Sequence, residues 1–154
     1  MKIISNMIEA HIFRETQNGI EFLLLKRAEN EIYPGLWQMV NGKVEGNETA
    51  YQAAVREIKE ETGLHPEKLW VVPNVNTFYS HELNEIFLLP VFAAKVKGDE
   101  KAVICEEHSD SCWCSPEETM DLLAWEGQRH SVELICRYYS KDRIFWDYVE
   151  INLH

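Results

Sequence analysis

Residues 42–64 read GKVEGNETAYQAAVREIKEETGL. This stretch fits the pattern G-x5-E-x7-R-E-U-x-E-E-x-G-U, in which U is an aliphatic residue and x is any residue, and all nine specified positions are filled. With ordinary residue frequencies, such a match would arise by chance with a probability well under about one in a million. The segment is therefore the strongest functional signal in the chain.

The second half of the segment has the signals of an α-helix. Thr49 is a favourable N-cap residue, no Gly or Pro interrupts residues 50–62, and Gly63 supplies a C-terminal stop. Apolar side chains recur at helical spacing, which predicts an amphipathic helix. Its apolar face carries Tyr51, Val55 and Ile58.

Three carboxylates on this predicted helix point to a metal site. Glu57, Glu60 and Glu61 stand at positions i, i+3 and i+4, so they project from about one face, and a hard cation would relieve their repulsion. Mg²⁺ suits such an open cluster because it prefers oxygen ligands and keeps several waters, and Mn²⁺ is the alternative ion. An ordinary solvated helix face is the other interpretation, and the complete pattern disfavours it.

Arg56 and Glu48 are expected to support the carboxylates. The guanidinium of Arg56 can hold Glu48 by a bidentate pair and so fix the orientation of the ligands. Gly42 and Gly46 allow the loop before the helix to bend and to approach a ligand closely. The helix N-terminus adds unpaired N–H groups, an arrangement that suits a diphosphate.

Four residues outside the helix are candidates for substrate contact. Arg27 and Lys43 could neutralise phosphate charge, with surface solubility as the alternative role. Trp37 could stack on a purine or pterin ring while Gln38 reads its edge, and core packing of Trp37 is an equally supported alternative.

The remaining pattern predicts one α/β domain that spans residues 1–154. Asn18 and Gly19 carry a turn signal between two apolar runs, which predicts a β-hairpin. Strands on both sides of one central helix, with a helix near the C-terminus, favour an α/β sandwich. The expected strands are 3–14, 21–27, 36–40, 69–77, 83–96 and 103–114, the later helices begin at Pro116 and cover 128–139, and residues 145–154 form a strand or cover apolar surface.

The charge balance limits the partners. The chain carries 26 acidic and 15 basic residues, a formal net charge of −11, which would repel nucleic acid and anionic membranes, so neither is an expected partner. The longest apolar run, residues 86–94, is too short to cross a bilayer, and the first residues lack a signal-peptide pattern, so a cytoplasmic location is expected.

The four cysteines lack metal-site spacing and are expected to be reduced thiols. The aromatic residues near the C-terminus are assigned to core packing, with a homodimer interface as the alternative.

The pattern at residues 42–64 resembles the Nudix box, so the chain is similar to the Nudix hydrolases. This resemblance implies an α/β/α sandwich with a mixed sheet and cleavage of nucleoside diphosphates linked to another moiety. In that family the glutamates matching Glu57, Glu60 and Glu61 bind divalent metal. The backbone carbonyl just before the box, here that of Asn41, often joins them.

Short motifs outside the box resemble bacterial dihydroneopterin triphosphate pyrophosphatases, also described as dATP pyrophosphohydrolases. These motifs are Lys26-Arg27, Leu36-Trp37-Gln38, Glu107-His108 with Trp113 five residues later, and Gln128-Arg129. In that subgroup the Glu before His is a further metal ligand, which implies Glu107 here, with Glu106 as the alternative. The chain departs from the subgroup at Met39, at Asn41 and through much of residues 69–102.

These observations predict a Mg²⁺-dependent pyrophosphohydrolase in which water attacks a phosphorus of a nucleoside- or pterin-triphosphate-like substrate. Glu60 is the expected proton acceptor, and Glu61 or Glu107 are the alternatives. Two other functions stay open: hydrolysis of diadenosine polyphosphates or nucleotide sugars, and nucleotide sensing without turnover. Sensing domains often lose carboxylates from the box, and this box has lost none.

Overall fold

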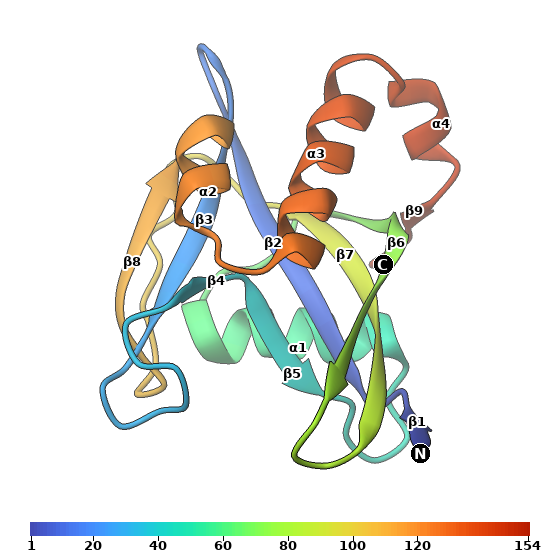
Figure 1. Cartoon of the computed structure of the whole chain (residues 1–154). Coiled ribbons are helices and arrows are strands. Elements are labelled where there is room, and N and C mark those ends of the chain that lie inside the picture. Colours follow the sequence, from blue (N-terminus) through green and yellow to red (C-terminus); the bar gives the residue numbers. More distant parts are fainter.

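The computed structural model describes residues 1–154 as one mixed sheet with helices on both faces (Figure 1). The strands are β1 (Lys2–Ile4), β2 (Met7–Thr16), β3 (Gly19–Arg27), β4 (Trp37–Gln38), β5 (Val40–Lys43), β6 (Lys68–Ser80), β7 (Glu85–Lys95), β8 (His108–Cys114) and β9 (Glu150–Ile151). The helices are α1 (Ala50–Thr62), α2 (Pro116–Leu122), α3 (Glu126–Ser140) and α4 (Arg143–Asp147). The predicted sandwich with a mixed sheet is confirmed, and none of its helices has the length and hydrophobicity that a bilayer crossing requires.

Strand β2 is the centre of the sheet and has partners on both of its edges. It runs parallel to β7 on one edge and antiparallel to β3 and β5 on the other. That second edge changes partner along its length, because residues 7–10 pair with β5 and residues 13–16 pair with β3. The predicted hairpin is the β2–β3 pair.

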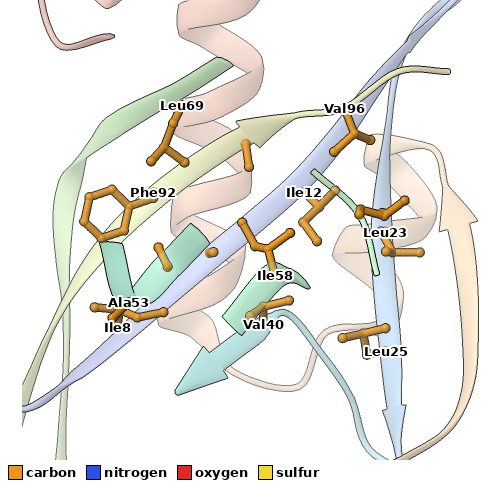
Figure 2. Close-up of a cluster of buried hydrophobic side chains, with 14 residues drawn as sticks. Ile8, Ile12, Leu23, Leu25, Val40, Ala53, Ile58, Leu69, Phe92 and Val96 are labelled. Atoms are coloured by element: carbon orange, nitrogen blue, oxygen red, sulfur yellow. The ribbon is translucent and has the colours of Figure 1, made fainter. Parts of the chain in front are cut away.

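The first core cluster lies between the sheet and α1. Because side chains alternate along a strand, Ile8 and Ile12 of β2 share the face that meets α1 (Figure 2). Helix α1 contributes Ala53, Ala54 and Ile58 to this cluster, and all three are fully buried. The small alanines let the helix approach the sheet closely, so the chain direction of α1 is fixed relative to β5 and β2.

The second core cluster lies on the opposite face of the sheet, under α3 and α4. Phe13 of β2 belongs to it, together with Val132 of α3. Trp146 of α4 stacks on Trp70 of β6 with ring centroids 4.2 Å apart and an interplanar angle of 15°. The C-terminal segment is therefore held by aromatic packing, as the core-packing interpretation expects for Trp146.

Helix α1 begins and ends where its sequence signals place it. Thr49 accepts a hydrogen bond from the backbone N–H of Gln52, whose side chain accepts one from the N–H of Thr49. Gly63 ends the helix with a φ of 71°, a left-handed conformation that suits glycine. The deepest face differs from the predicted one, because Ala53, Ala54 and Ile58 are buried whereas Tyr51 and Val55 are only partly buried.

Several predicted boundaries were wrong. The strand expected over residues 36–40 is two strands, and the second continues through Gly42 because β5 pairs with the start of β2. The strand expected over 3–14 is broken after Ile4: β1 pairs with residues 85–87 of β7, and β2 begins at Met7 and pairs with residues 91–95 of the same strand. Residues 103–107 precede β8 without joining it, and residues 143–147 form the unpredicted helix α4.

Candidate functional site

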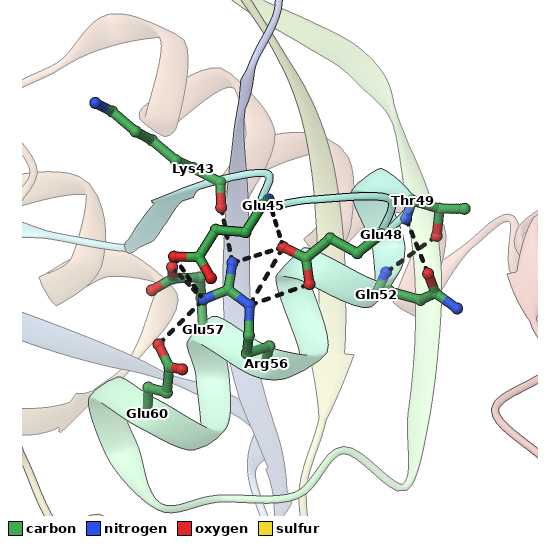
Figure 3. Close-up of polar contacts among 8 residues, drawn as sticks. All are labelled: Lys43, Glu45, Glu48, Thr49, Gln52, Arg56, Glu57 and Glu60. Atoms are coloured by element: carbon green, nitrogen blue, oxygen red, sulfur yellow. Dashed lines mark hydrogen bonds and ion pairs between the residues drawn. The ribbon is translucent and has the colours of Figure 1, made fainter.

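Arg56 connects α1 to the loop that precedes it (Figure 3). Its guanidinium forms a bidentate pair with Glu48, with the shortest N···O distance at 2.7 Å, and also donates to the carbonyl oxygen of Lys43 at 2.7 Å. It further contacts Glu57 at 2.8 Å and Glu60 at 3.1 Å. The hydrogen bond from Arg56 to Glu48 lowers the pKa of that carboxyl, which stays ionised.

Glu57 is held against the backbone of β5. A Cβ atom added to Gly42 would overlap the carboxyl group of Glu57, so only glycine leaves room for that carboxylate. Burial raises the pKa of Glu57, and the neighbouring charges of Glu60 and Glu107 raise it further against the opposing effect of Arg56. Because Gly42 has no side chain, the space beside its backbone is a cradle for the Glu57 carboxylate.

Glu61 is the most deeply placed carboxylate of the box, with only 4% of its surface exposed. Its Oε2 atom is buried and has no hydrogen-bond partner. Burial, with the charges of Glu57 and Glu107, raises the pKa of Glu61 to about 9, while Arg27 opposes the rise. A buried carboxylate without a counter-ion is costly, and a bound cation would relieve that cost.

Glu107 and His108 reach the same place from the start of β8. The charge of Glu107 raises the pKa of both Glu57 and Glu61. His108 Nε2 lies 3.8 Å from Glu61 Oε1. Burial and the nearby charge of Arg27 lower the pKa of His108, so a neutral imidazole faces Glu61.

These carboxylates fit a hard divalent cation. The donor set is all oxygen, Glu61 Oε2 is an orphaned buried acceptor, and the cradle at Gly42 holds Glu57 beside it. As the side chains stand, no three His, Cys, Asp or Glu groups are close enough to ligate one ion. Glu60 is drawn toward Arg56, with 58% of its side chain exposed.

A cavity of about 680 Å³ opens on the α3 face of the sheet. Its volume is in the range of small-molecule sites. It is lined by Met7, Glu9, Arg27, Ile32, Tyr33, Gln38, Asn41, Asn76, Thr77, Phe78, Tyr79, Leu89, Trp125, Glu126, Gly127 and Gln128. Arg27 joins the cavity to the carboxylates, because it lines the former and its charge acts on Glu61.

A buried polar network lies at the floor of this cavity. Glu9 Oε1 accepts from Asn76 Nδ2 at 2.9 Å and from Gln128 Nε2 at 3.3 Å. Glu9 Oε2 accepts from His11 Nε2 at 2.8 Å. Burial raises the pKa of Glu9, but the hydrogen bonds from His11, Asn76 and Gln128 outweigh burial, so the pKa lies below its usual value and the carboxylate is ionised.

The residues predicted to contact substrate separate into two groups. Arg27 and Gln38 line the cavity, and the Arg27 guanidinium is held by the carbonyl oxygen of Ile32 and by Glu31. Trp37 packs against the second core cluster and Lys43 is exposed, and neither lines the cavity. The Lys43 side chain extends away from the carboxylates (Figure 3).

The cavity floor was not identified from the sequence. Glu9 and His11 alternate with Ile8, Ala10 and Ile12 in an otherwise apolar run, so a carboxylate and an imidazole share one face of a buried strand. That alternation was the available signal, because buried charge is rare unless it is paired. Gln128 stood out only as part of the Gln128-Arg129 motif, and Asn76, from a distant segment, gave no signal.

A family model described as NUDIX domain matches residues 8–135. The chain therefore belongs to the Nudix family, whose members include enzymes that hydrolyse phosphoric anhydrides, and it is such a hydrolase. The resemblance of residues 42–64 to the Nudix box is confirmed.

Two curated relatives and one solved structure show which Nudix proteins the chain is similar to. The chain is 31% identical over 126 residues to the nucleoside triphosphatase NudI of Salmonella agona, covering 77% of this chain and 89% of that one. It is 30% identical over 102 residues to the CTP pyrophosphohydrolase of Escherichia coli, covering 65% and 70%. The dihydroneopterin triphosphate pyrophosphohydrolase of E. coli has the same fold, with a TM-score of 0.68 at 24% identity over 84% of this chain and 93% of that one.

Proposed function

We propose that this chain is a Mg²⁺-dependent pyrophosphohydrolase that cleaves a nucleoside- or pterin-triphosphate-like substrate by attack of water on phosphorus. The observation that carries the proposal is Glu61, a buried carboxylate with an unpartnered oxygen, whose pKa the charges of Glu57 and Glu107 raise. A cavity of about 680 Å³ is lined by Arg27, whose charge acts on Glu61, and by Asn41, the residue before the box. The names of the relatives, which include a nucleoside triphosphatase and a CTP pyrophosphohydrolase, support a nucleotide substrate.

Glu57, Glu61 and Glu107 would hold the metal, together with Glu60 once that side chain leaves Arg56. Bound Mg²⁺, or Mn²⁺, would supply Lewis acidity toward the phosphate oxygens and lower the pKa of a bound water. The glutamates supply the negative charge that binds the ion. Arg56 keeps Glu48 and the 42–48 loop in place and so fixes where the carboxylates point.

Glu60 is the proposed acceptor of the proton from the attacking water. It is the most solvent-exposed carboxylate of the box face, so water reaches it without rearrangement of the core. Arg27 lines the cavity and its charge acts on Glu61, so it would contact the phosphate chain. Glu61 and Glu107 are the alternative proton acceptors.

The wider setting is also part of the proposal. The partner is a small phosphorylated molecule, and the surplus of acidic residues argues against nucleic acid as a partner. All four cysteines are free thiols, which is typical of the reducing cytoplasm. Phe145 and Tyr148 are exposed apolar residues at the C-terminal end and are the residues through which a homodimer would form.

The test is a substrate panel with Mg²⁺ in water enriched in ¹⁸O. The panel contains dihydroneopterin triphosphate, the common nucleoside triphosphates, a diadenosine polyphosphate and a nucleotide sugar. We expect pyrophosphate and a monophosphate from a triphosphate, with ¹⁸O in one of the two products. If only the dinucleotide or the nucleotide sugar is hydrolysed, that class is the substrate in place of a triphosphate. Tight binding without any turnover would favour the sensing alternative.

A further inference from the structure

The ionised Glu9 fixes the orientation of two amides in the cavity. A carboxylate can only accept hydrogen bonds, whereas an amide side chain has one accepting and one donating end. Asn76 and Gln128 must therefore turn their NH₂ groups toward Glu9. Their carbonyl oxygens are left facing away from it, and neither oxygen has a hydrogen-bond partner in the protein.

Both carbonyl oxygens lack a hydrogen-bond donor from the protein. Gln128 is only 2% exposed and its Oε1 atom is buried without a partner, a state that is costly unless a ligand supplies a donor. Asn76 Oδ1 is packed against Gly127, where a Cβ would collide with it, so the amide has little room to move. The floor of the cavity is thus a fixed pair of acceptors.

Aromatic rings stand around the mouth of the same cavity. Tyr33 and Trp125 meet edge to face with ring centroids 5.6 Å apart, and both remain substantially exposed. Phe78 of β6 is also exposed and stacks on Phe87 at 5.0 Å. Flat rings with exposed faces suit the stacking of a planar heterocycle.

We propose that this cavity selects a heterocycle with two adjacent hydrogen-bond donors, namely the 2-amino-4-oxopyrimidine edge shared by guanine and pterins. That edge offers a ring N–H and an exocyclic NH₂ side by side to Asn76 Oδ1 and Gln128 Oε1. Its neighbouring carbonyl can accept from the amide of Gln38, which lines the cavity. Adenine and cytosine offer one exocyclic amine beside a ring acceptor, which would face a second acceptor unpaired.

This inference rests on the proposed function, because it assumes that the heterocycle belongs to the substrate hydrolysed at the box carboxylates. Asn41 lines the cavity, and its neighbour Gly42 packs against Glu57. Arg27 also belongs to both regions. A heterocycle on the cavity floor would therefore direct its phosphate chain toward the box carboxylates.

The first test measures binding without metal or phosphate, so it does not depend on hydrolysis. Guanosine, neopterin, adenosine and cytidine are titrated into the protein in EDTA by calorimetry. We expect guanosine or neopterin to bind about 10- to 100-fold more tightly than adenosine and cytidine, and the comparison of the first two identifies the source of the edge. Equal binding of adenosine, or no binding of guanosine and neopterin at millimolar concentration, would overturn the inference.

The second test removes the charge that orients the amides. In Glu9→Gln the new amide can donate as well as accept, so Asn76 and Gln128 are free to turn, and the preference over adenosine should fall at least about 10-fold. Glu21→Gln is the matched control, because Glu21 pairs with Arg14 outside the cavity. Asn76→Ala serves if Glu9→Gln does not fold, and an unchanged preference in a folded variant would contradict the proposal. If the wild type binds guanosine but hydrolyses no triphosphate, the proposed function is wrong and the inference about the cavity stands.

Discussion

Glu57 lies directly against the backbone of Gly42, and a methyl group on residue 42 would overlap its carboxyl group. We therefore expect Gly42→Ala to displace Glu57 from its place beside Glu61 and to reduce Mg²⁺-dependent turnover by at least about 10-fold, since loss of one fixed ligand costs this much in comparable metal sites. Steady-state kinetics over a range of Mg²⁺ concentrations would measure the loss.

The matched control for this change is Gly98→Ala. A Cβ at Gly98 would meet only the carbonyl oxygen of Glu15 at 3.6 Å, an ordinary contact. This variant should keep wild-type turnover. Equal activity of the two variants would show that the contact between Gly42 and Glu57 has no part in catalysis.

Arg56→Lys should weaken the whole support of the carboxylates. Lysine carries the same charge, but it cannot form the bidentate pair with Glu48 and at the same time donate to the carbonyl oxygen of Lys43. We expect kcat/KM to fall by about 10-fold or more and the Mg²⁺ requirement to rise. Arg14→Lys, at a pair with Glu21 remote from the site, is the control, and the same Mg²⁺ dependence in both variants would contradict the supporting role of Arg56.

Glu61→Gln should stabilise the metal-free protein at alkaline pH. The folded-state pKa of Glu61 is raised to about 9, above the ordinary value of 4.5, so the folded protein holds a proton that the unfolded chain has lost. The stability from this proton is fully present below pH 4.5 and is lost as the pH rises toward 9. Glutamine lacks this dependence, so in EDTA at pH 8.5 the variant should melt at least about 3 °C higher than the wild type.

The same pair of proteins provides the internal check. At pH 4.5 the two melting temperatures should approach each other, because the unfolded chain then also holds much of the proton that folding takes up at higher pH. Mg²⁺ at pH 8.5 should raise the melting temperature of the wild type more than that of the variant. A variant less stable than the wild type in EDTA at pH 8.5 would mean that Glu61 is not strained by burial.

The sequence was sufficient for those parts of the site that depend on local geometry. Thr49 and Gly63 set the ends of α1 through short-range hydrogen bonds and a left-handed φ. The i, i+3, i+4 spacing then places Glu57, Glu60 and Glu61 on one side of the helix. The depths of these three differ, however, because the sheet covers Glu61 and leaves Glu60 in solvent.

The parts that depend on distant pairing were beyond the reach of local patterns. The predicted strand ended too early, at residue 40. Strand β5 continues through Gly42 because it pairs with β2, which lies over thirty residues earlier in the chain. The cavity floor joins Glu9 to Asn76 and Gln128, from β2, β6 and α3. Gln38 and Trp37 are neighbours in sequence, and only the fold shows that the first lines the cavity and the second packs in the core.

Mn²⁺ binding followed by electron paramagnetic resonance tests most directly whether a divalent cation binds at Glu61. Wild-type protein should bind Mn²⁺ in competition with Mg²⁺, and Glu61→Gln should weaken that binding by at least about 10-fold. Glu67→Gln, an exposed carboxylate near Lys95, should bind as the wild type does. Equal Mn²⁺ affinity in all three proteins would contradict the assignment of the metal site to Glu61.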